Sequence, residues 1–210
     1  MIPARLVLAT ANRGKVAELA GLIHEWGEVE VLALDAFPGV ACPEETGATY
    51  VENALKKARA VATATALAAL ADDSGLEVDA LGGAPGVHSA RWAGVGASDQ
   101  ERVRRLLAAL TDVPAERRTA RFVCVVALAW LDGHVVTATG AVHGRIVPAP
   151  TGGGGFGYDP VFLPDELGAT FATVPAVEKA RVSHRARAVR ALGLALRRCA
   201  GPPARVRDSQ

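Results

Sequence analysis

The chain is short of aromatic residues and lysines, and it carries no excess charge of either sign. Of its 210 residues, 5% are aromatic, and only four of the 23 basic residues are lysines. The 23 basic and 22 acidic residues nearly cancel, which argues against a basic surface for nucleic acid and against an acidic, solvating chain. No apolar run approaches the ~20 residues that are needed to span a bilayer.

Cysteine and histidine are too few and too scattered to suggest a metal cage. The three cysteines, Cys42, Cys124 and Cys199, include no CxxC pair, and the five histidines show no HxH or HExxH spacing. We therefore expect neither a disulfide framework nor a zinc site. The N-terminal residues run directly into a strand-like segment and lack the apolar core of a signal peptide. The sequence predicts a soluble, cytoplasmic protein with no nucleic-acid or membrane partner.

The rest of the pattern is an alternation of strand-like and helix-like segments. The length predicts one domain, or at most two small lobes around a shared cleft. Capping boxes and apolar residues at helical spacing predict helices from 15 onward and at 49–65, 98–110 and 183–198. Strands are expected at 5–10, 29–34, 67–71, 121–131 and 135–146, the last two joined by a hairpin. The sequence therefore predicts an α/β fold with an antiparallel component and a frayed tail at 201–210.

The first candidate site is the turn Thr10–Lys15, between a predicted strand and a predicted helix. Backbone N–H groups at a helix N-terminus, with one glycine and one lysine, form a cradle for an anion. The turn is not a Walker loop, because Ala9 and Val16 stand where that motif needs Gly and Ser or Thr. The alternative is an ordinary turn with a solvated lysine. The few lysines left in an arginine-rich chain either mark places where an ammonium and a guanidinium are not equivalent or are there by chance.

Paired carboxylates, Asp72 and Asp73, follow the third predicted strand. Adjacent strand residues point to opposite faces, so only one of them can face a given cleft. A carboxylate at a strand end suits Mg²⁺, which prefers oxygen ligands and phosphate partners, and an Asx turn is the alternative. Glu44 and Glu45 suggest a second metal carboxylate, with an exposed acidic turn as the alternative.

A glycine-rich loop follows the predicted hairpin. Residues 152–157 formally match GxGxxG, but Asp159-Pro160 stands where a dinucleotide-binding motif needs a helix. Glycines beside Phe156 and Tyr158 suit the close approach and stacking of a flat ring. A mobile surface loop is the alternative.

The last candidate segment runs from Lys179 to the start of the final helix at Ser183. His184 and Arg185 offer hydrogen-bond donors for an anion or for the acceptor edge of a base. The alternative is a solvated, arginine-rich helix face, which we prefer for the arginines further along that helix.

The order of these segments carries more information than any one of them. LATANRGK is followed by EETG, ENALKKA, ADDSGLEVDALGGAPGVHSARWAG, GGFGYDP, and a lysine with SHR. This series covers nearly the whole chain and resembles the inosine triphosphate pyrophosphatase family, which hydrolyses non-standard purine nucleoside triphosphates. The resemblance implies an elongated mixed α/β sheet with flanking helices, whose two lobes, within one domain at 1–200, surround a central nucleotide-binding cleft. It also implies a homodimer.

The resemblance assigns roles within the motifs. Asp73 is expected to be the catalytic proton acceptor and to hold Mg²⁺ together with Glu44, with Glu45 as the alternative ligand. Asp72 faces away, so we expect its substitution to be much milder. Contacts with the substrate are expected at Thr10, Ala11, Asn12, Arg13, Gly14, Lys15, Lys57, Ser74, Phe156, Gly157, Tyr158, Asp159, Lys179, His184 and Arg185.

Residue chemistry and resemblance lead to the same expected reaction. Water oriented or deprotonated by Asp73 attacks the α-phosphorus of ITP, dITP or XTP, while Mg²⁺ and lysines offset the phosphate charge. A nucleoside monophosphate and pyrophosphate result. Two alternatives stay open, namely a related pyrophosphatase for other modified nucleotides and a nucleotide-binding protein without turnover.

Overall fold

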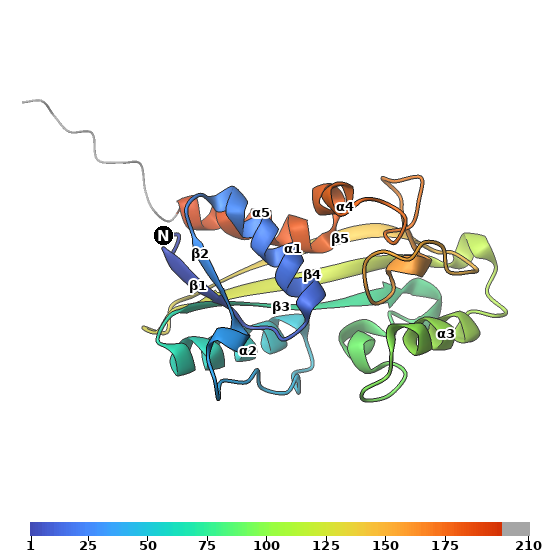
Figure 1. The fold of residues 1–210 in the computed structure, drawn as a ribbon. Coiled ribbons are helices and arrows are strands. Elements are labelled where there is room, and N and C mark those ends of the chain that lie inside the picture. Colours follow the sequence, from blue (N-terminus) through green and yellow to red (C-terminus); the bar gives the residue numbers. More distant parts are fainter. Residues whose placement is uncertain (199–210) are drawn as a thin grey trace, which may run out of the picture.

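The computed structural model describes residues 1–198, and its centre is one mixed six-stranded sheet (Figure 1). The strand order is β2-β1-β3-β4-β5-β6; β1 is parallel to β2 and β3, and the later pairs are antiparallel. The strands are β1 (Arg5–Leu8), β2 (Glu30–Ala33), β3 (Ala68–Val78), β4 (Thr119–Ala129), β5 (Val135–Ile146) and β6 (Phe162–Pro164). Three of them, β3 to β5, are long enough to run the length of the molecule.

Five α-helices and six short 3-10 helices surround the sheet in the described part of the chain. The α-helices are α1 (Arg13–Ile23), α2 (Tyr50–Thr65), α3 (Asp99–Ala109), α4 (Ala176–Val182) and α5 (His184–Arg198). The 3-10 helices are η1 (His24–Trp26), η2 (Leu34–Ala36), η3 (Asp79–Leu81), η4 (Gly86–Arg91), η5 (Ala115–Arg117) and η6 (Asp159–Val161). No helix among these residues has the length and apolar composition of a bilayer span.

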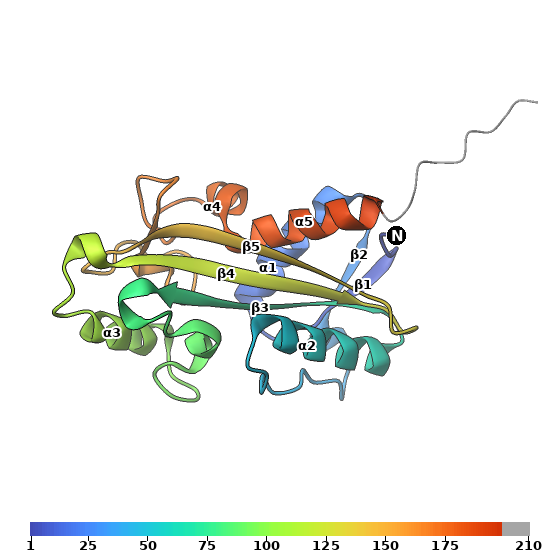
Figure 2. The same cartoon turned by 180° about the vertical axis from the view of Figure 1, so that it is seen from behind.

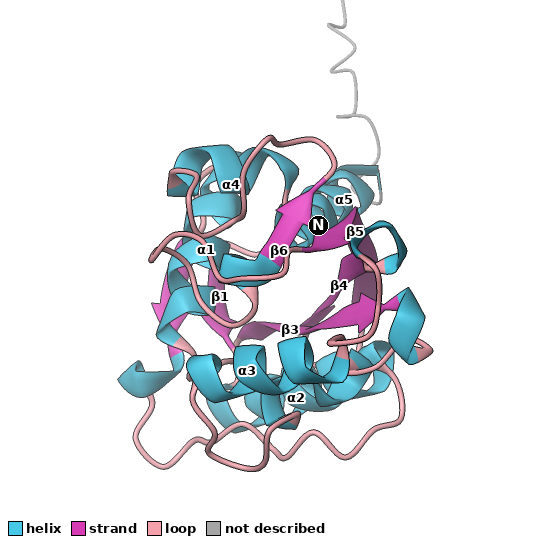
Figure 3. Ribbon diagram, turned by 90° about the vertical axis from the view of Figure 1, so that its right-hand side faces the viewer, coloured by secondary structure: helices cyan, strands magenta, loops and turns pink. Residues whose placement is uncertain are grey.

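The helices lie on opposite faces of the long strands. In Figures 1 and 2, α1 and α5 cover one face at the β1 end, while α2 covers the other. Figure 3, which looks along the strands, shows α4 on the α1 side of β3 and α3 on the α2 side. The fold is thus the expected elongated α/β sheet with flanking helices, in three layers.

The hydrophobic core is divided along β3. Leu70 belongs to a cluster under α1 and α5, and Ala71 to a cluster under α2. Leu76 belongs to a third cluster at the far end, with residues of α3 and the segment around β6. Residues 72–75 therefore occupy the gap between the apolar clusters, which is where polar side chains can gather.

The capping signals in the sequence are confirmed. Thr49 and Ser98 each form a complete capping box, with Glu52 and Glu101 as their partners. The side chain of Ser183 accepts a hydrogen bond from the backbone of Ala186 at the start of α5. These local interactions explain why the helix starts could be predicted to within a residue or two.

The prediction for the third strand was wrong about its end. It does not stop at Ala71, because β3 continues through Asp72 and Asp73 to Val78 and pairs with β4 throughout. The Asx-turn interpretation fails with it. Two short elements, α4 and β6, were not predicted. Cys199 and the predicted tail at 201–210 lie outside the described residues.

Candidate active site

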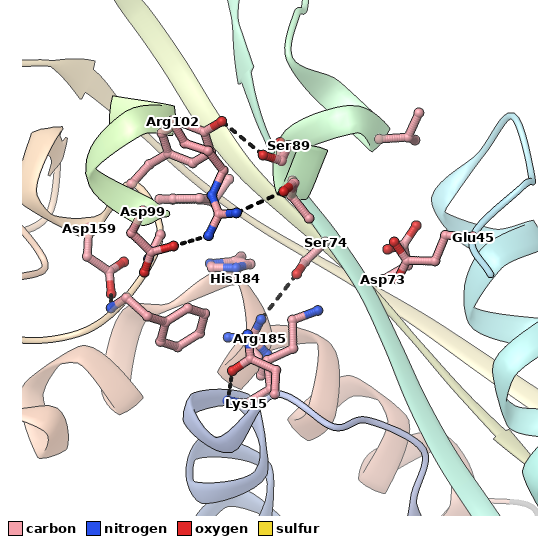
Figure 4. A pocket seen from close by; sticks show the side chains of 18 of the residues that line it. Lys15, Glu45, Asp73, Ser74, Ser89, Asp99, Arg102, Asp159, His184 and Arg185 are labelled. Carbon is pink, nitrogen blue, oxygen red and sulfur yellow. Dashed lines mark hydrogen bonds and ion pairs between the residues drawn. The ribbon is translucent and has the colours of Figure 1, made fainter. Parts of the chain in front are cut away.

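Two adjoining pockets lie where the apolar core is interrupted. The inner pocket lies among β3, the start of α3, the glycine-rich loop and the start of α5 (Figure 4). The outer pocket lies between the Thr10–Lys15 turn, the acidic loop at 43–47 and η4. Both pockets are lined by Asn12, Lys15 and Glu45, so they form one continuous cleft.

The start of α1 forms one wall of the cleft. Asn12 caps this helix: its Oδ1 accepts a hydrogen bond of 3.1 Å from the backbone N–H of Lys15. Thr10 and Ala11 line the outer pocket. Arg13 and Gly14 do not line either pocket. The Phe156 ring occupies the space where a side chain at position 14 would lie, because a Cβ there would be 2.7 Å from this ring. The anion cradle and the glycine-rich loop are therefore in direct contact.

Asp72, on the α1 side of β3, is the fully buried partner of two cations. Its Oδ2 lies 2.9 Å from Lys15 Nζ and 3.1 Å from Arg185 Nη2, and it accepts a 3.2 Å hydrogen bond from Ser74. Burial favours the protonated acid, but the charges of Lys15, Arg185 and Lys57 outweigh burial and hold the pKa of Asp72 well below its usual range. Asp72 thus joins the helix starts of α1 and α5.

Asp73 points to the opposite face, toward α2, as the strand alternation predicts. Asn53 donates a 3.0 Å hydrogen bond to its Oδ2, and Lys57 Nζ lies 3.7 Å from its Oδ1. Burial, which outweighs the attraction of Lys57, and the negative charge of Glu45 raise the pKa of Asp73 to about 6. This carboxylate therefore has a pKa suited to accepting a proton near neutral pH.

Lys57 ties the acidic loop to β3. Its Nζ donates hydrogen bonds of 2.5 Å to Glu45 Oε1 and 2.6 Å to the backbone oxygen of Asp72. Arg91 contacts Glu45 from the other side and donates a 2.8 Å hydrogen bond to its backbone oxygen. Glu44 is exposed and lines only the outer pocket. Glu45 is half-buried, lines both pockets and pairs with Lys57 and Arg91, and Figure 4 shows it beside Asp73.

The far end of the inner pocket combines an aromatic ring with buried cations. Lys179 Nζ lies 4.8 Å from the Phe156 ring centroid, and the Arg185 guanidinium lies 5.6 Å from it, within the range of cation–π contacts. Lys179 also pairs with Asp159 Oδ2 at 2.6 Å and with Glu18 at 2.8 Å. The structure therefore brings together the glycine-rich loop, α4 and the start of α5, as expected.

His184 and Tyr158 contribute apolar surface to the inner pocket. The His184 ring stacks on Phe122 with a centroid distance of 4.7 Å, and its Nδ1 has no partner among the described residues. Burial and the charges of Arg185 and Lys179 lower the pKa of His184 well below its usual value, so the imidazole is neutral. Tyr158 is buried and donates a 2.9 Å hydrogen bond to the backbone of Ser89.

Several residues in the cleft or directly behind it were missed by sequence reasoning. Glu18 joins Lys179 and Arg185, and Asn53 holds Asp73. Asp99 accepts a 2.7 Å hydrogen bond from the backbone of Gly157 and pairs with Arg102. The one available signal was helical spacing: Glu18 stands one turn after Lys15, and Asn53 one turn before Lys57.

The cleft offers oxygen ligands for a divalent cation. Within residues 1–198 no group of three or more His, Cys, Asp and Glu side chains forms a metal cage. Asp73 and Glu45 nevertheless place two carboxylates on the cleft wall, close enough for the charge of one to raise the pKa of the other. Mg²⁺ is commonly held by one or two carboxylates with substrate phosphates rather than by an all-protein cage. The donor set therefore fits Mg²⁺.

The cleft of this α/β protein places buried lysines and paired carboxylates beside a helix N-terminus. This arrangement is typical of the class of proteins that bind phosphorylated ligands. The model of the Ham1 family matches residues 6–194. The chain belongs to the Ham1 family, so the resemblance stated from the motifs is confirmed.

Relatives and solved structures agree with this membership. The dITP/XTP pyrophosphatase of Symbiobacterium thermophilum is 52% identical over 88% of this chain and 91% of its own. A dITP/XTP pyrophosphatase of Thermus thermophilus is 52% identical over 96% of this chain and 95% of its own. The structure of a HAM1 protein from Coxiella burnetii superposes with a TM-score of 0.82 at 41% identity, over 92% of this chain and 98% of that one.

Proposed function

We propose that this protein hydrolyses non-standard purine nucleoside triphosphates, among them dITP, XTP and ITP, to the monophosphate and pyrophosphate. Its membership of the Ham1 family and its similarity to proteins named dITP/XTP pyrophosphatase support the reaction. The observation that carries the proposal is the placement of Asp73, a buried carboxylate that lines the inner pocket, accepts a hydrogen bond from Asn53 and lies 3.7 Å from Lys57. A nucleotide-binding protein without turnover has no need of such a group.

We infer that the triphosphate occupies the outer pocket and the base the inner pocket. The outer pocket has the start of α1, Lys15 and Lys57 along its walls, and these are the positive groups that a triphosphate needs. The inner pocket has the Phe156 ring and the glycine-rich loop, which suit a flat base. The continuity of the two pockets through Asn12 and Lys15 supports a position of the α-phosphate near Asp73.

We propose that Asp73 and Glu45 hold Mg²⁺, with Glu45 in place of the predicted Glu44. Glu45 lines both pockets and Asp73 lines the inner one, whereas Glu44 lines only the outer pocket. When bound, the ion neutralises charge on the phosphate oxygens. The protein contributes the two carboxylates and holds each with its own partner, Asn53 for Asp73 and Lys57 for Glu45.

In the proposed reaction Asp73 accepts the proton of the attacking water. The water oxygen forms a bond with the α-phosphorus, and the bond from the α-phosphorus to the oxygen that bridges to the β-phosphorus breaks. Pyrophosphate leaves with that oxygen, and the monophosphate stays in the cleft. Lys15 and Lys57 offset the charge that develops on the phosphates, and neither needs to gain or lose a proton.

Selection of the base follows from the hydrogen-bonding character of the inner pocket. Hypoxanthine and xanthine present a 6-oxo acceptor where adenine presents a 6-amino donor. Lys179 and Arg185 at this end have donors and no acceptor, although Asp159, Glu18 and Asp72 already engage part of these donors. We infer that the remaining donors suit a 6-oxo acceptor, and that adenine would place a donor against them in a desolvated site. A site built on hydrogen bonds rejects such a mismatch by up to ~10⁴-fold. Guanine shares the 6-oxo group, so this argument concerns ATP only.

A triphosphate panel tests the proposal. Pyrophosphate and orthophosphate are quantified separately with dITP, XTP, ITP, GTP and ATP, with and without Mg²⁺. We expect Mg²⁺-dependent release of pyrophosphate from dITP and XTP, with kcat/KM at least ~100-fold above that for ATP. Equal turnover of ATP and dITP would refute the base argument. Nucleotide binding without pyrophosphate release would instead support a nucleotide sensor.

We further propose, from family membership, that residues 1–200 act as one two-lobed unit, and that the protein is a cytoplasmic homodimer without nucleic-acid or membrane partners. Light scattering coupled to gel filtration tests the dimer. A mass near 21.7 kDa in solution would contradict it.

A further inference from the structure

Asn53 is a fully buried amide that lies behind the cleft and does not line either pocket. It is on the first turns of α2, one turn before Lys57. Its Nδ2 donates hydrogen bonds of 3.0 Å to Asp73 Oδ2 and 3.4 Å to the backbone oxygen of Gly47. Its Oδ1 accepts one of 2.8 Å from the backbone N–H of Gly47. Every hydrogen-bonding group of this amide is thus directed at Asp73 or at the acidic loop.

These contacts join the two carboxylates of the cleft through one side chain. The bond to Oδ2 leaves Oδ1 as the oxygen of Asp73 that faces Lys57. The bonds to Gly47 fix the loop two residues after Glu45. A buried amide with three hydrogen bonds has one orientation, because any rotation leaves polar atoms unpaired in the protein interior. Asn53 therefore helps to set the separation of Asp73 from Glu45, together with Lys57, which contacts both carboxylates directly.

The packing around Gly47 shows that the chain makes room for this amide. A Cβ at Gly47 would lie 2.8 Å from Asn53 Oδ1 and 2.8 Å from the Cβ of Glu52. Only glycine lets the loop backbone approach the amide closely enough for both hydrogen bonds. A methyl group at this position would push on Asn53 without changing Asn53 itself.

Lys56 provides a contrast on the same helix. Its Nζ donates 2.8 Å hydrogen bonds to the backbone oxygen of Glu44 and to Thr46 Oγ1, so it also fastens the acidic loop to α2. Neither of these bonds involves Asp73. A loss of function that came only from loosening the loop would appear equally when Lys56 or Asn53 is changed.

We propose that Asn53 is a positioning residue that orients Asp73 and Glu45 as a pair for a divalent cation. The inference rests on the proposed function, since it takes these two carboxylates as the cation ligands. Residues that orient metal ligands typically change metal affinity or activity by 10- to 100-fold when they are removed. Asn53 does not touch the cleft, so its removal acts on turnover and cation affinity rather than on nucleotide binding.

The test compares wild type with Asn53→Leu, which keeps the branched shape and the number of heavy atoms and removes the hydrogen bonds. Two quantities are measured: kcat and KM for dITP, and binding of Mn²⁺ alone, from the electron paramagnetic resonance signal of the free ion. We expect kcat and Mn²⁺ affinity each to fall by at least ~10-fold, with KM within ~3-fold. A folded variant with wild-type kcat and Mn²⁺ affinity overturns the proposal, as does a raised KM with unchanged kcat.

Gly47→Ala and Lys56→Ala complete the design. Gly47→Ala is expected to lower kcat and Mn²⁺ affinity as Asn53→Leu does, but by smaller factors. It serves as the test if Asn53→Leu does not fold. Lys56→Ala is expected to stay within ~3-fold of wild type in kcat and Mn²⁺ affinity. Equal losses in Lys56→Ala and Asn53→Leu would assign the effect to the loop alone and refute the positioning role.

The Mn²⁺ measurement separates this inference from the proposed function. A wild type that releases no pyrophosphate from any nucleotide refutes the function, while a fall in Mn²⁺ affinity in Asn53→Leu still supports the positioning role. Equal Mn²⁺ affinity in wild type and variant refutes the positioning role even if dITP is hydrolysed as proposed.

Discussion

Asp72 and Asp73 are neighbours in the chain and almost equally buried, yet their surroundings differ in electrostatic character. Asp72 has two cations on its carboxylate, Lys15 and Arg185, which hold its pKa well below the usual range. Asp73 has an amide, a more distant lysine and the negative Glu45, and its pKa is raised to about 6. Burial alone raises the pKa of both; the neighbours decide the outcome.

One strand can therefore carry a structural carboxylate and a reactive carboxylate side by side. Alternation along β3 sends one aspartate toward α1 and α5 and the next toward α2. The first is a permanently charged partner that fixes two cations of the cleft. The second is free to exchange a proton near neutral pH. Substitutions of Asp73, Asp72 and Lys15 each change one of these two surroundings.

The largest effect is expected for Asp73→Asn. The substitution removes the proposed proton acceptor and one metal charge, so kcat for dITP should fall at least ~100-fold. Stopped assays for pyrophosphate on the folded variant measure this. Near-normal turnover in a variant with a wild-type circular dichroism spectrum would refute the assignment of Asp73.

The next largest effect is expected for Asp72→Asn, which should lower the unfolding free energy. The mild effect expected from the sequence concerns turnover, because Asp72 faces away from Asp73; its partners predict a separate effect on stability. Lys15 and Arg185 would remain buried without their countercharge, which costs about 3 kcal/mol of unfolding free energy. Chemical denaturation measures the loss. Glu30→Gln is the control, since it breaks an exposed pair with Arg5 and should change stability by less than ~1 kcal/mol. Equal effects of the two substitutions would contradict the prediction.

Lys15→Arg tests whether the ion pair with Asp72 needs an ammonium rather than a guanidinium. Lys15 Nζ lies 2.9 Å from Asp72 Oδ2, the same oxygen that Arg185 contacts, and a planar guanidinium does not reproduce the compact ammonium at this position. We expect kcat/KM for dITP to fall by about 10-fold although the charge is kept. A variant with wild-type kcat/KM would also remove the argument from the retained lysines.

Sequence reasoning succeeded where the signal was local. The capping boxes at Thr49 and Ser98 predicted helix starts, and the motifs predicted which segments meet at the cleft. All three lysines that were singled out from the sequence, Lys15, Lys57 and Lys179, lie in this cleft within buried or partly buried ion pairs.

Sequence reasoning failed where the partners are distant in the chain. Residues 72–75 have turn-like composition, yet they continue a strand because Lys15, Arg185 and Asn53 compensate the buried carboxylates from remote segments. The role of Asn53 could not be predicted for the same reason, because its partner Asp73 is distant in the chain and only the fold brings the two residues together. The proposal of Glu45 rather than Glu44 as a cation ligand likewise rests on the loop conformation, which the sequence does not give.

The smallest expected effect is on the pH dependence of stability, and the two aspartates should contribute with opposite signs. The pKa of Asp73 is raised to about 6 from an ordinary value of 3.8, so between these values the folded protein binds more protons than the unfolded chain. Its contribution to the unfolding free energy therefore falls as the pH rises from about 4 to about 6. Asp72 has a lowered pKa, so its contribution is present above about pH 4 and is lost as the pH falls below that.

Asp73→Asn isolates the first of these contributions, because it leaves Asp72 and its cations in place. The unfolding free energy of the variant minus that of wild type should increase by roughly 2 kcal/mol between about pH 4 and about pH 6.5. This is less than the full value of a two-unit pKa shift, because the unfolded aspartate already loses protons at about pH 4 and the folded one is not fully ionised at about pH 6.5. The contacts that Lys57 and Asn53 lose add an offset that does not depend on pH. Urea denaturation of both proteins across this pH range, without divalent cations, gives the difference directly. A difference that stays constant with pH would mean that Asp73 titrates at its ordinary value, and the contrast between the two faces of β3 would then lie in geometry alone.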